Sequence, residues 1–149
     1  VGFDKLYFDE TNSRMVMNFR NNYARLAEAL YANGEKEKAI AVLDRCVAEF
    51  PRDVVTLSYF AIPLVDIYYK AGADEKGTQL LSTMMDDFLV NYYYLSEFDR
   101  GTGIKRNLEI SIQVLGSLSR IIQIHKLEDP TYIYTEKDHI YLRNYMKIL

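Results

Sequence analysis

Residues 19–51 read FRNNYARLAEALYANGEKEKAIAVLDRCVAEFP and contain two helical patterns separated by a tight turn. Gly34 supplies the backbone freedom that a helix C-terminus needs, and Pro51 ends the second helix because it lacks an amide hydrogen. The spacing of three and four residues puts two sets of side chains in the predicted core, namely Phe19, Tyr23, Leu26, Ala27 and Leu30, and then Ala39, Val42, Leu43, Cys46, Val47 and Phe50. These residues therefore predict a helical hairpin.

The hairpin pattern occurs a second time along the chain. YANGEKEKA at residues 31–39 corresponds to YKAGADEKG at residues 69–77. In this second copy we expect one helix over 53–71, kinked or split at Pro63, and a second helix from Asp74 to Phe98. Gly77 takes the place of a small alanine, which suggests that two helices approach closely there.

The remaining residues predict an arm and a third hairpin. Residues 1–17 show no clear period, and we expect the first helix to begin near Arg14 or Asn18. A long helix follows over 104–126, and a last helix begins at about Thr135. We therefore predict one all-α domain over residues 1–149, divided into an N-terminal arm at 1–17, repeats at 18–51 and 53–98, and a degenerate third hairpin at 103–149.

Composition and charge exclude several functional classes. The chain has 149 residues, a net charge of −3 and one cysteine, Cys46. The charge gives no reason to expect nucleic acid binding, and a single cysteine excludes an intrachain disulfide. The apolar runs are too short to span a membrane.

No residue pattern predicts a catalytic, cofactor or metal site. Asp86 and Asp87 are neighbours on a helix and so point about 100° apart. His125 and His139 each lack a second histidine at ligand spacing. We read Cys46 as a packing residue and expect a protein without enzymatic activity.

The first hairpin resembles a tetratricopeptide repeat. The resemblance is carried by Tyr23, Leu26, Ala27, Leu30, Gly34, Ala39, Leu43, Cys46 and Pro51. The second copy matches less completely, at Ala61, Leu64, Val65, Tyr68, Gly77, Leu81 and Met84. The resemblance implies a right-handed stack of about three helix hairpins.

In such a stack the first helix of each pair lines the concave face. By resemblance, the partner-binding residues are Asn21, Ala24, Glu28, Tyr31, Tyr59, Ile62, Asp66 and Tyr69. Amides, carboxylates and tyrosine rings suit an extended peptide, so we expect protein–protein interaction or scaffolding. The alternative is that the chain's own arm or third hairpin fills the groove.

A second resemblance concerns Leu6-Tyr7-Phe8-Asp9-Glu10-Thr11-Asn12 and Tyr59-Phe60-Ala61-Ile62-Pro63. Both look like parts of a Bacteroidetes membrane family that is similar to protein O-mannosyltransferases. This resemblance implies a fragment of a membrane protein, an accessory periplasmic domain that contacts acceptor polypeptide or the membrane part. Otherwise a cytoplasmic location is expected. A small enzyme or sugar-binding domain that uses Tyr and carboxylates is a third hypothesis.

Overall fold

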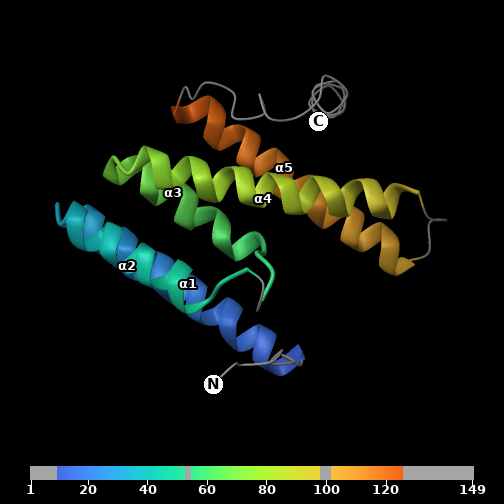
Figure 1. Ribbon diagram of the computed structural model, residues 1–149, viewed down its shortest axis with the longest axis horizontal. Coiled ribbons are helices and arrows are strands. Elements are labelled where there is room, and N and C mark those ends of the chain that lie inside the picture. The colour runs from blue at the N-terminus through green and yellow to red at the C-terminus, as the bar shows by residue number, and fades with distance from the viewer. Residues whose placement is uncertain (1–9, 53–54, 98–101, 126–149) are drawn as a thin grey trace. The chain divides into compact units, whose positions relative to one another are not determined.

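A computed structural model describes residues 10–52, 55–97 and 102–125, and every regular element among them is helical (Figure 1). The fold is an all-α, tetratricopeptide-like helical one, as predicted. Residues 1–9 of the arm predicted at 1–17, and the predicted last helix from Thr135, lie outside the described residues, whereas residues 10–17 belong to a helix. The elements are α1 (Glu10–Ala32), α2 (Lys36–Glu49), the 3₁₀ helix η1 (Tyr59–Ala61), α3 (Ile62–Ala71), α4 (Asp74–Ser96) and α5 (Thr102–His125).

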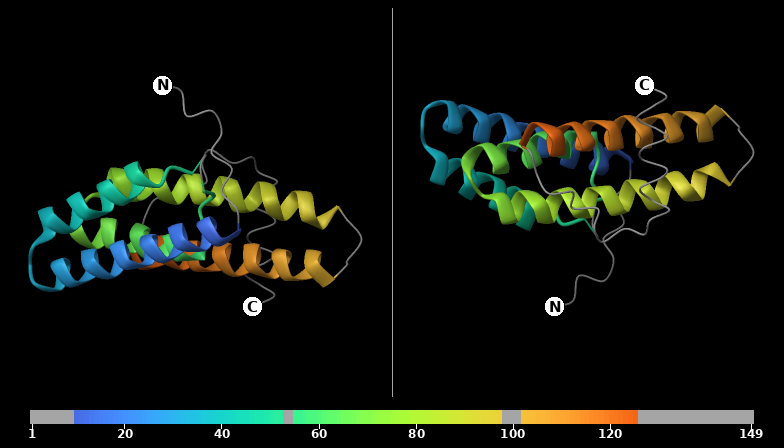
Figure 2. Two further views of the ribbon diagram at one scale, coloured as in Figure 1. Left: turned by 90° about the horizontal axis from the view of Figure 1, so that it is seen from below. Right: turned by 90° about the horizontal axis from the view of Figure 1, so that it is seen from above.

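Helices α1 and α2 form the predicted hairpin and run in opposite directions from a short turn (Figure 2). Gly34 has a φ of +82°, and its amide donates to the Tyr31 carbonyl oxygen at 2.9 Å. The buried side of α2 consists of Ala39, Leu43 and Cys46, which were all predicted to lie in the core. Gly72 repeats the arrangement between α3 and α4 with a φ of +86°.

The two turn glycines give a direct test of the repeat. A side chain at a φ near +80° is strained, so Gly34→Ala and Gly72→Ala should each lower the free energy of unfolding by about 1 kcal/mol. Gly103 has a helical backbone in the first turn of α5 with open space around it, so Gly103→Ala should be neutral or slightly stabilising. Urea unfolding of the three variants checks this, and equal effects at all three positions would contradict it.

Helix α1 differs from its prediction in where it begins and in which side it buries. It begins at Glu10 rather than near Arg14 or Asn18, because polar residues such as Thr11 suit a first turn as well as a loop. Its buried residues are Val16, Arg20, Ala24 and Ala27. The two small alanines lie on the side of α1 that packs against α2, α3 and η1.

Phe19 and Leu26 were predicted to lie in the core but are 46% and 50% exposed. The reason is geometric: at about 100° per residue, the apolar residues of α1 span roughly 200° of its circumference. The neighbouring helices cover only part of that arc. The periodicity was therefore read correctly as helical, but the core face was placed too far toward Leu26.

Arg20 is the largest side chain that is fully buried, at 1% exposure. Its guanidinium donates to three backbone carbonyl oxygens, those of Phe50 at 2.9 Å, Val55 at 2.6 Å and Thr56 at 2.8 Å. Phe50 is the C-cap of α2, where a positive charge complements the helix dipole. One side chain of α1 thus holds the segment that joins the two repeats.

The helix predicted over 53–71 is shorter, because α3 begins only at Ile62. Residues 55–58 are not helical, since the carbonyls of Val55 and Thr56 accept hydrogen bonds from Arg20 rather than from a helical turn. Pro63 lies in the first turn of α3, where its missing amide costs nothing. Pro63 thus lies just after the junction of η1 and α3, rather than inside a longer helix that it kinks or splits as predicted.

The chain forms two compact units, Val1–Gly77 and Thr78–Leu149. At the end of the first unit, a Cβ on Gly77 would lie 3.1 Å from the Tyr69 ring, which confirms the predicted close contact. In the second unit, α5 runs antiparallel to α4 (Figure 2). The buried apolar side chains there are Leu80, Leu81, Met84, Met85, Phe88, Leu89, Val114, Leu115, Leu118 and Ile121.

Candidate interaction surface

Six of the eight predicted binding residues reach the surface of the first unit. Asn21, Glu28 and Tyr31 do so on α1, and Tyr59, Ile62 and Asp66 do so on η1 and α3. The other two, Ala24 and Tyr69, are buried. Ala24 lies where α1 packs, and the Tyr69 ring lies against Gly77, so both shape the surface from beneath rather than line it.

Glu28, Tyr31, Asp66 and Lys70 form a group that we call the α1–α3 polar cluster. Lys70 Nζ lies 2.6 Å from Asp66 Oδ2, one turn away on α3. The hydrogen bond to Asp66 raises the pKa of Lys70, partial burial opposes this rise, and the negative charges of Asp66 and Glu28 add to it. Glu28 of α1 is thus near enough to this ion pair of α3 to affect it electrostatically, and Tyr31 would act in the same direction when ionised at high pH.

Sequence reasoning missed Lys70. It was read only as part of the Tyr69-Lys70-Ala71-Gly72 turn motif. The signal that identifies it is its spacing from Asp66, because oppositely charged residues four apart on a helix are neighbours. That α1 supplies Glu28 and Tyr31 to the same place follows from the packing of α1 against α3.

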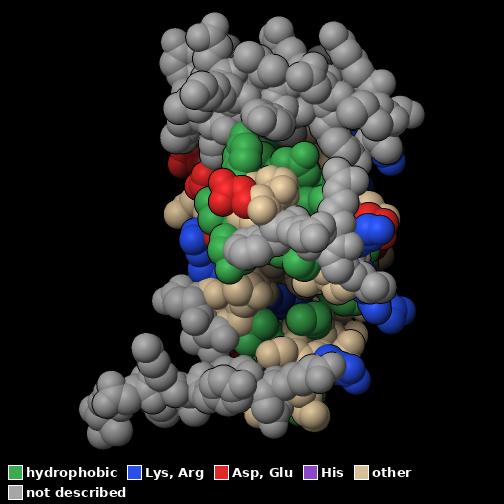
Figure 3. Space-filling model, turned by 90° about the vertical axis from the view of Figure 1, so that its right-hand side faces the viewer, with side chains coloured by type: hydrophobic (Ala, Val, Ile, Leu, Met, Phe, Trp, Pro, Cys, Tyr) green, Lys and Arg blue, Asp and Glu red, His purple; other side chains and the backbone are tan. Residues whose placement is uncertain are grey.

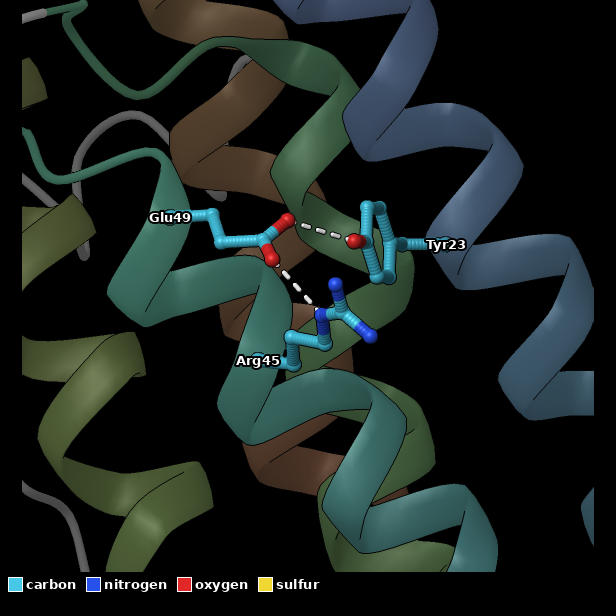
Figure 4. A network of polar contacts seen from close by, with 3 residues as sticks. All are labelled: Tyr23, Arg45 and Glu49. Atoms are coloured by element: carbon cyan, nitrogen blue, oxygen red, sulfur yellow. Dashed lines mark hydrogen bonds and ion pairs between the residues drawn. The ribbon is translucent and has the colours of Figure 1, made fainter.

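A second polar network lies between α1 and α2 (Figure 4). The Tyr23 hydroxyl donates to Glu49 Oε2 at 2.6 Å, and Arg45 Nε donates to Glu49 Oε1 at 2.6 Å. These hydrogen bonds lower the pKa of Glu49 and raise that of Tyr23. The network is exposed to solvent, so it orients the hairpin edge more than it stabilises it.

A third polar contact connects the two repeats through Asp44. Tyr68 Oη donates to Asp44 Oδ1 at 2.9 Å, and Lys76 Nζ lies 2.6 Å from Asp44 Oδ2. Burial and this hydrogen bond raise the pKa of Tyr68. Asp44 thus joins α2 to α3 and to the first turn of α4, and it holds the first helix of repeat 2 against the second helix of repeat 1.

Cys46 is buried, and burial raises the pKa of its thiol to about 11. A thiol with such a pKa is protonated at neutral pH and is a poor nucleophile. This agrees with a packing role. Among the described residues, no group of three His, Cys, Asp or Glu side chains is placed to hold a metal ion.

The thiol also predicts a pH dependence. Because the folded pKa of Cys46 is about 11 and an unfolded thiol ionises near 9, the folded state retains a proton that the unfolded state loses. Stability should therefore fall as the pH rises from about 9 toward 11. Urea unfolding at several pH values should show a smaller decrease between about pH 9 and 10 in Cys46→Ala. Parallel curves for variant and wild type would contradict the assignment.

Apolar side chains also reach the surface. On the face drawn in Figure 3 they lie between charged and other polar side chains. In the first unit, three exposed ones share one side of α1, namely Met15, Phe19 and Leu26. The Phe19 ring stacks on Phe50 at 5.8 Å, and Tyr23 meets Phe50 edge to face at 6.1 Å.

None of the described helices combines the length and the apolar character that crossing a membrane requires.

Comparison with known families supports the repeat assignment over part of the chain. The family model described as Tetratricopeptide repeat matches residues 20–62, which cover α1 from Arg20, all of α2 and the start of α3. No curated protein and no solved structure matches the chain. The resemblance to the Bacteroidetes membrane family therefore gains no support.

Proposed function

We propose that this chain is a non-catalytic protein-interaction domain that binds an extended segment of a protein partner against the α1–α3 polar cluster. The repeat match over residues 20–62 supports the general part of this proposal, since tetratricopeptide repeats serve protein–protein interaction and scaffolding. The α1–α3 polar cluster supports the more specific part, namely that an extended segment of the partner binds at this surface.

The cluster offers both kinds of contact that peptide recognition uses. Glu28, Asp66 and Lys70 present charged donors and acceptors to a polypeptide backbone and its polar side chains. Tyr31 on α1 and Tyr59 on η1 add large rings that lose little conformational freedom on binding. Because these residues lie on helices whose packing is fixed by buried neighbours, the surface is organised before a partner arrives.

A peptide-display selection on the immobilised full chain tests the proposal. A selected peptide is then titrated against the wild type and against Glu28→Ala, Tyr31→Ala and Lys70→Ala. We expect the dissociation constant to rise by about tenfold or more for at least one variant, as at other central contacts. Glu37→Ala, an exposed glutamate on α2, is the matched control and should bind like the wild type.

Two outcomes would contradict the proposal. A deep library that yields no binding peptide would remove peptide recognition as the function of this surface. Selected peptides that bind all three variants as tightly as the wild type would show that the partner binds elsewhere. Circular dichroism of each variant ensures that a loss of binding is not a loss of fold.

A further inference from the structure

The exposed apolar residues of α1 form a stripe along the helix. Met15 and Leu26 are each 50% exposed and Phe19 is 46% exposed, while Tyr23 and Leu30 are half-buried on the same side. We call these residues, with Asn22 at the border, the α1 stripe. Their steps of three and four residues suit contact with another helix.

The α1 stripe lies away from the α1–α3 polar cluster. Leu26 and Glu28 are two residues apart, which is about 200° around a helix. The cluster faces the side of α1 that packs against α3, whereas Met15, Phe19 and Leu26 of the stripe are about half exposed on another side. Phe19 and Tyr23 of the stripe also contact Phe50 at the end of α2. A contact at the stripe therefore leaves the proposed peptide surface accessible.

The stripe is complementary to itself under a two-fold rotation. Met15 and Leu30, Phe19 and Leu26, and Asn22 and Tyr23 are three pairs, each equidistant from the midpoint between residues 22 and 23. If two copies of α1 pack antiparallel about that midpoint, Phe19 of each copy meets Leu26 of the other. Met15, Phe19, Leu26 and Leu30 then each face an apolar side chain of the other copy, whereas Tyr23 faces Asn22, and each contact occurs twice, as an isologous interface requires.

Charge does not oppose this arrangement. Asn18 and Asn22 border the stripe on one side and are exposed and uncharged. Arg25 lies farther out on that side and meets Asn18 of the second copy, so two like charges do not face each other. A polar residue beside the axis also fixes the register of a helix pair.

We propose that a second copy of this chain occupies the α1 stripe, forming an antiparallel two-fold dimer through α1. The contact runs from Met15 to Leu30, about 24 Å of helix. The surface that such a helix pair buries is smaller than the roughly 800 Å² per partner that a stable complex buries. The dimer is therefore a weak one, with a dissociation constant on the order of 10–100 µM.

Sedimentation equilibrium of the full chain over a range of concentrations tests the dimer. We expect the apparent mass to rise from that of the monomer toward that of the dimer with increasing concentration. Leu26→Ser should raise the dissociation constant of the dimer at least about tenfold. Val90→Ser, which removes a still more exposed apolar side chain from α4, is the control and should leave dimerisation unchanged.

Cysteine cross-linking locates the axis. Asn22→Cys places a thiol beside the two-fold axis and should give a disulfide-linked dimer under copper-phenanthroline oxidation. Glu37→Cys, on an exposed part of α2, should not. The native Cys46 is buried and does not compete.

Failure would also identify the competing occupant. If the chain stays monomeric at all concentrations and the Asn22→Cys thiol reacts slowly with maleimide, another part of the same chain covers the stripe and the dimer is wrong. If it stays monomeric and the thiol reacts fast, the stripe is open to a different partner and the dimer is equally wrong. Neither result bears on peptide binding at the α1–α3 polar cluster.

Discussion

Replacing Arg20 by methionine should lower the free energy of unfolding by about 3–5 kcal/mol. Methionine fills most of the same volume but donates no hydrogen bond, so three backbone carbonyl oxygens lose their donor. Each buried polar group left without a partner costs about 1–3 kcal/mol. Burial lowers the pKa of Arg20, but the group remains charged at every pH at which the protein is folded. Urea unfolding monitored by circular dichroism measures the loss.

Two further variants show whether the loss comes from geometry or from charge. Arg20→Lys keeps the charge but cannot reach three carbonyls with one ammonium group, so we expect an intermediate loss of about 1–3 kcal/mol. Arg45→Met removes an exposed arginine whose ion pair with Glu49 is solvated, and it should leave stability nearly unchanged. A loss at Arg20→Met no larger than at Arg45→Met would refute the role given to Arg20.

Leu43→Ala should lower the free energy of unfolding by about 2–5 kcal/mol, because the Leu43 side chain on α2 is fully buried. Leu26→Ala removes the same atoms from a side chain that is half exposed, and the expected loss is below about 1 kcal/mol. The same unfolding experiment measures both. Equal losses at the two positions would place Leu26 in the core. They would show that the buried side of α1 has been assigned wrongly.

The helical hairpins were predictable because short-range signals define them. Gly34 and Gly72 each require a left-handed backbone, and each lies between two apolar stripes of helical period. The observed bounds of α2, α4 and α5 lie within a few residues of the predicted ones. These features depend on residues a few positions apart, which a sequence displays directly.

Contacts between distant residues were not predictable. Arg20 was assigned no role, because nothing near it in the sequence shows that it reaches carbonyls 30 to 36 residues away. The late start of α3 follows from the same contact. On α1, the wide apolar arc fits more than one core face, and periodicity alone does not choose between them.

The candidate site stays a prediction, although the structure shows which of its residues reach the surface. Glu28, Tyr31 and Asp66 were named from the repeat pattern and are at least partly exposed, whereas Lys70, which pairs with Asp66, was not named. Ala24 and Tyr69 were named by the same rule but are buried. A repeat pattern gives the side of a helix, whereas the exposure of each residue depends on the size of its neighbours in other helices.

The position of the Arg20 contacts also has a consequence for the order in which the protein forms during synthesis. The first hairpin is complete in sequence once Phe50 has been made, but the guanidinium then has only one of its three carbonyl partners. The carbonyls of Val55 and Thr56 belong to the chain that follows. We expect the nascent hairpin to remain loose until these residues have left the ribosome, so it becomes stable only after the segment that follows Pro51 has been made.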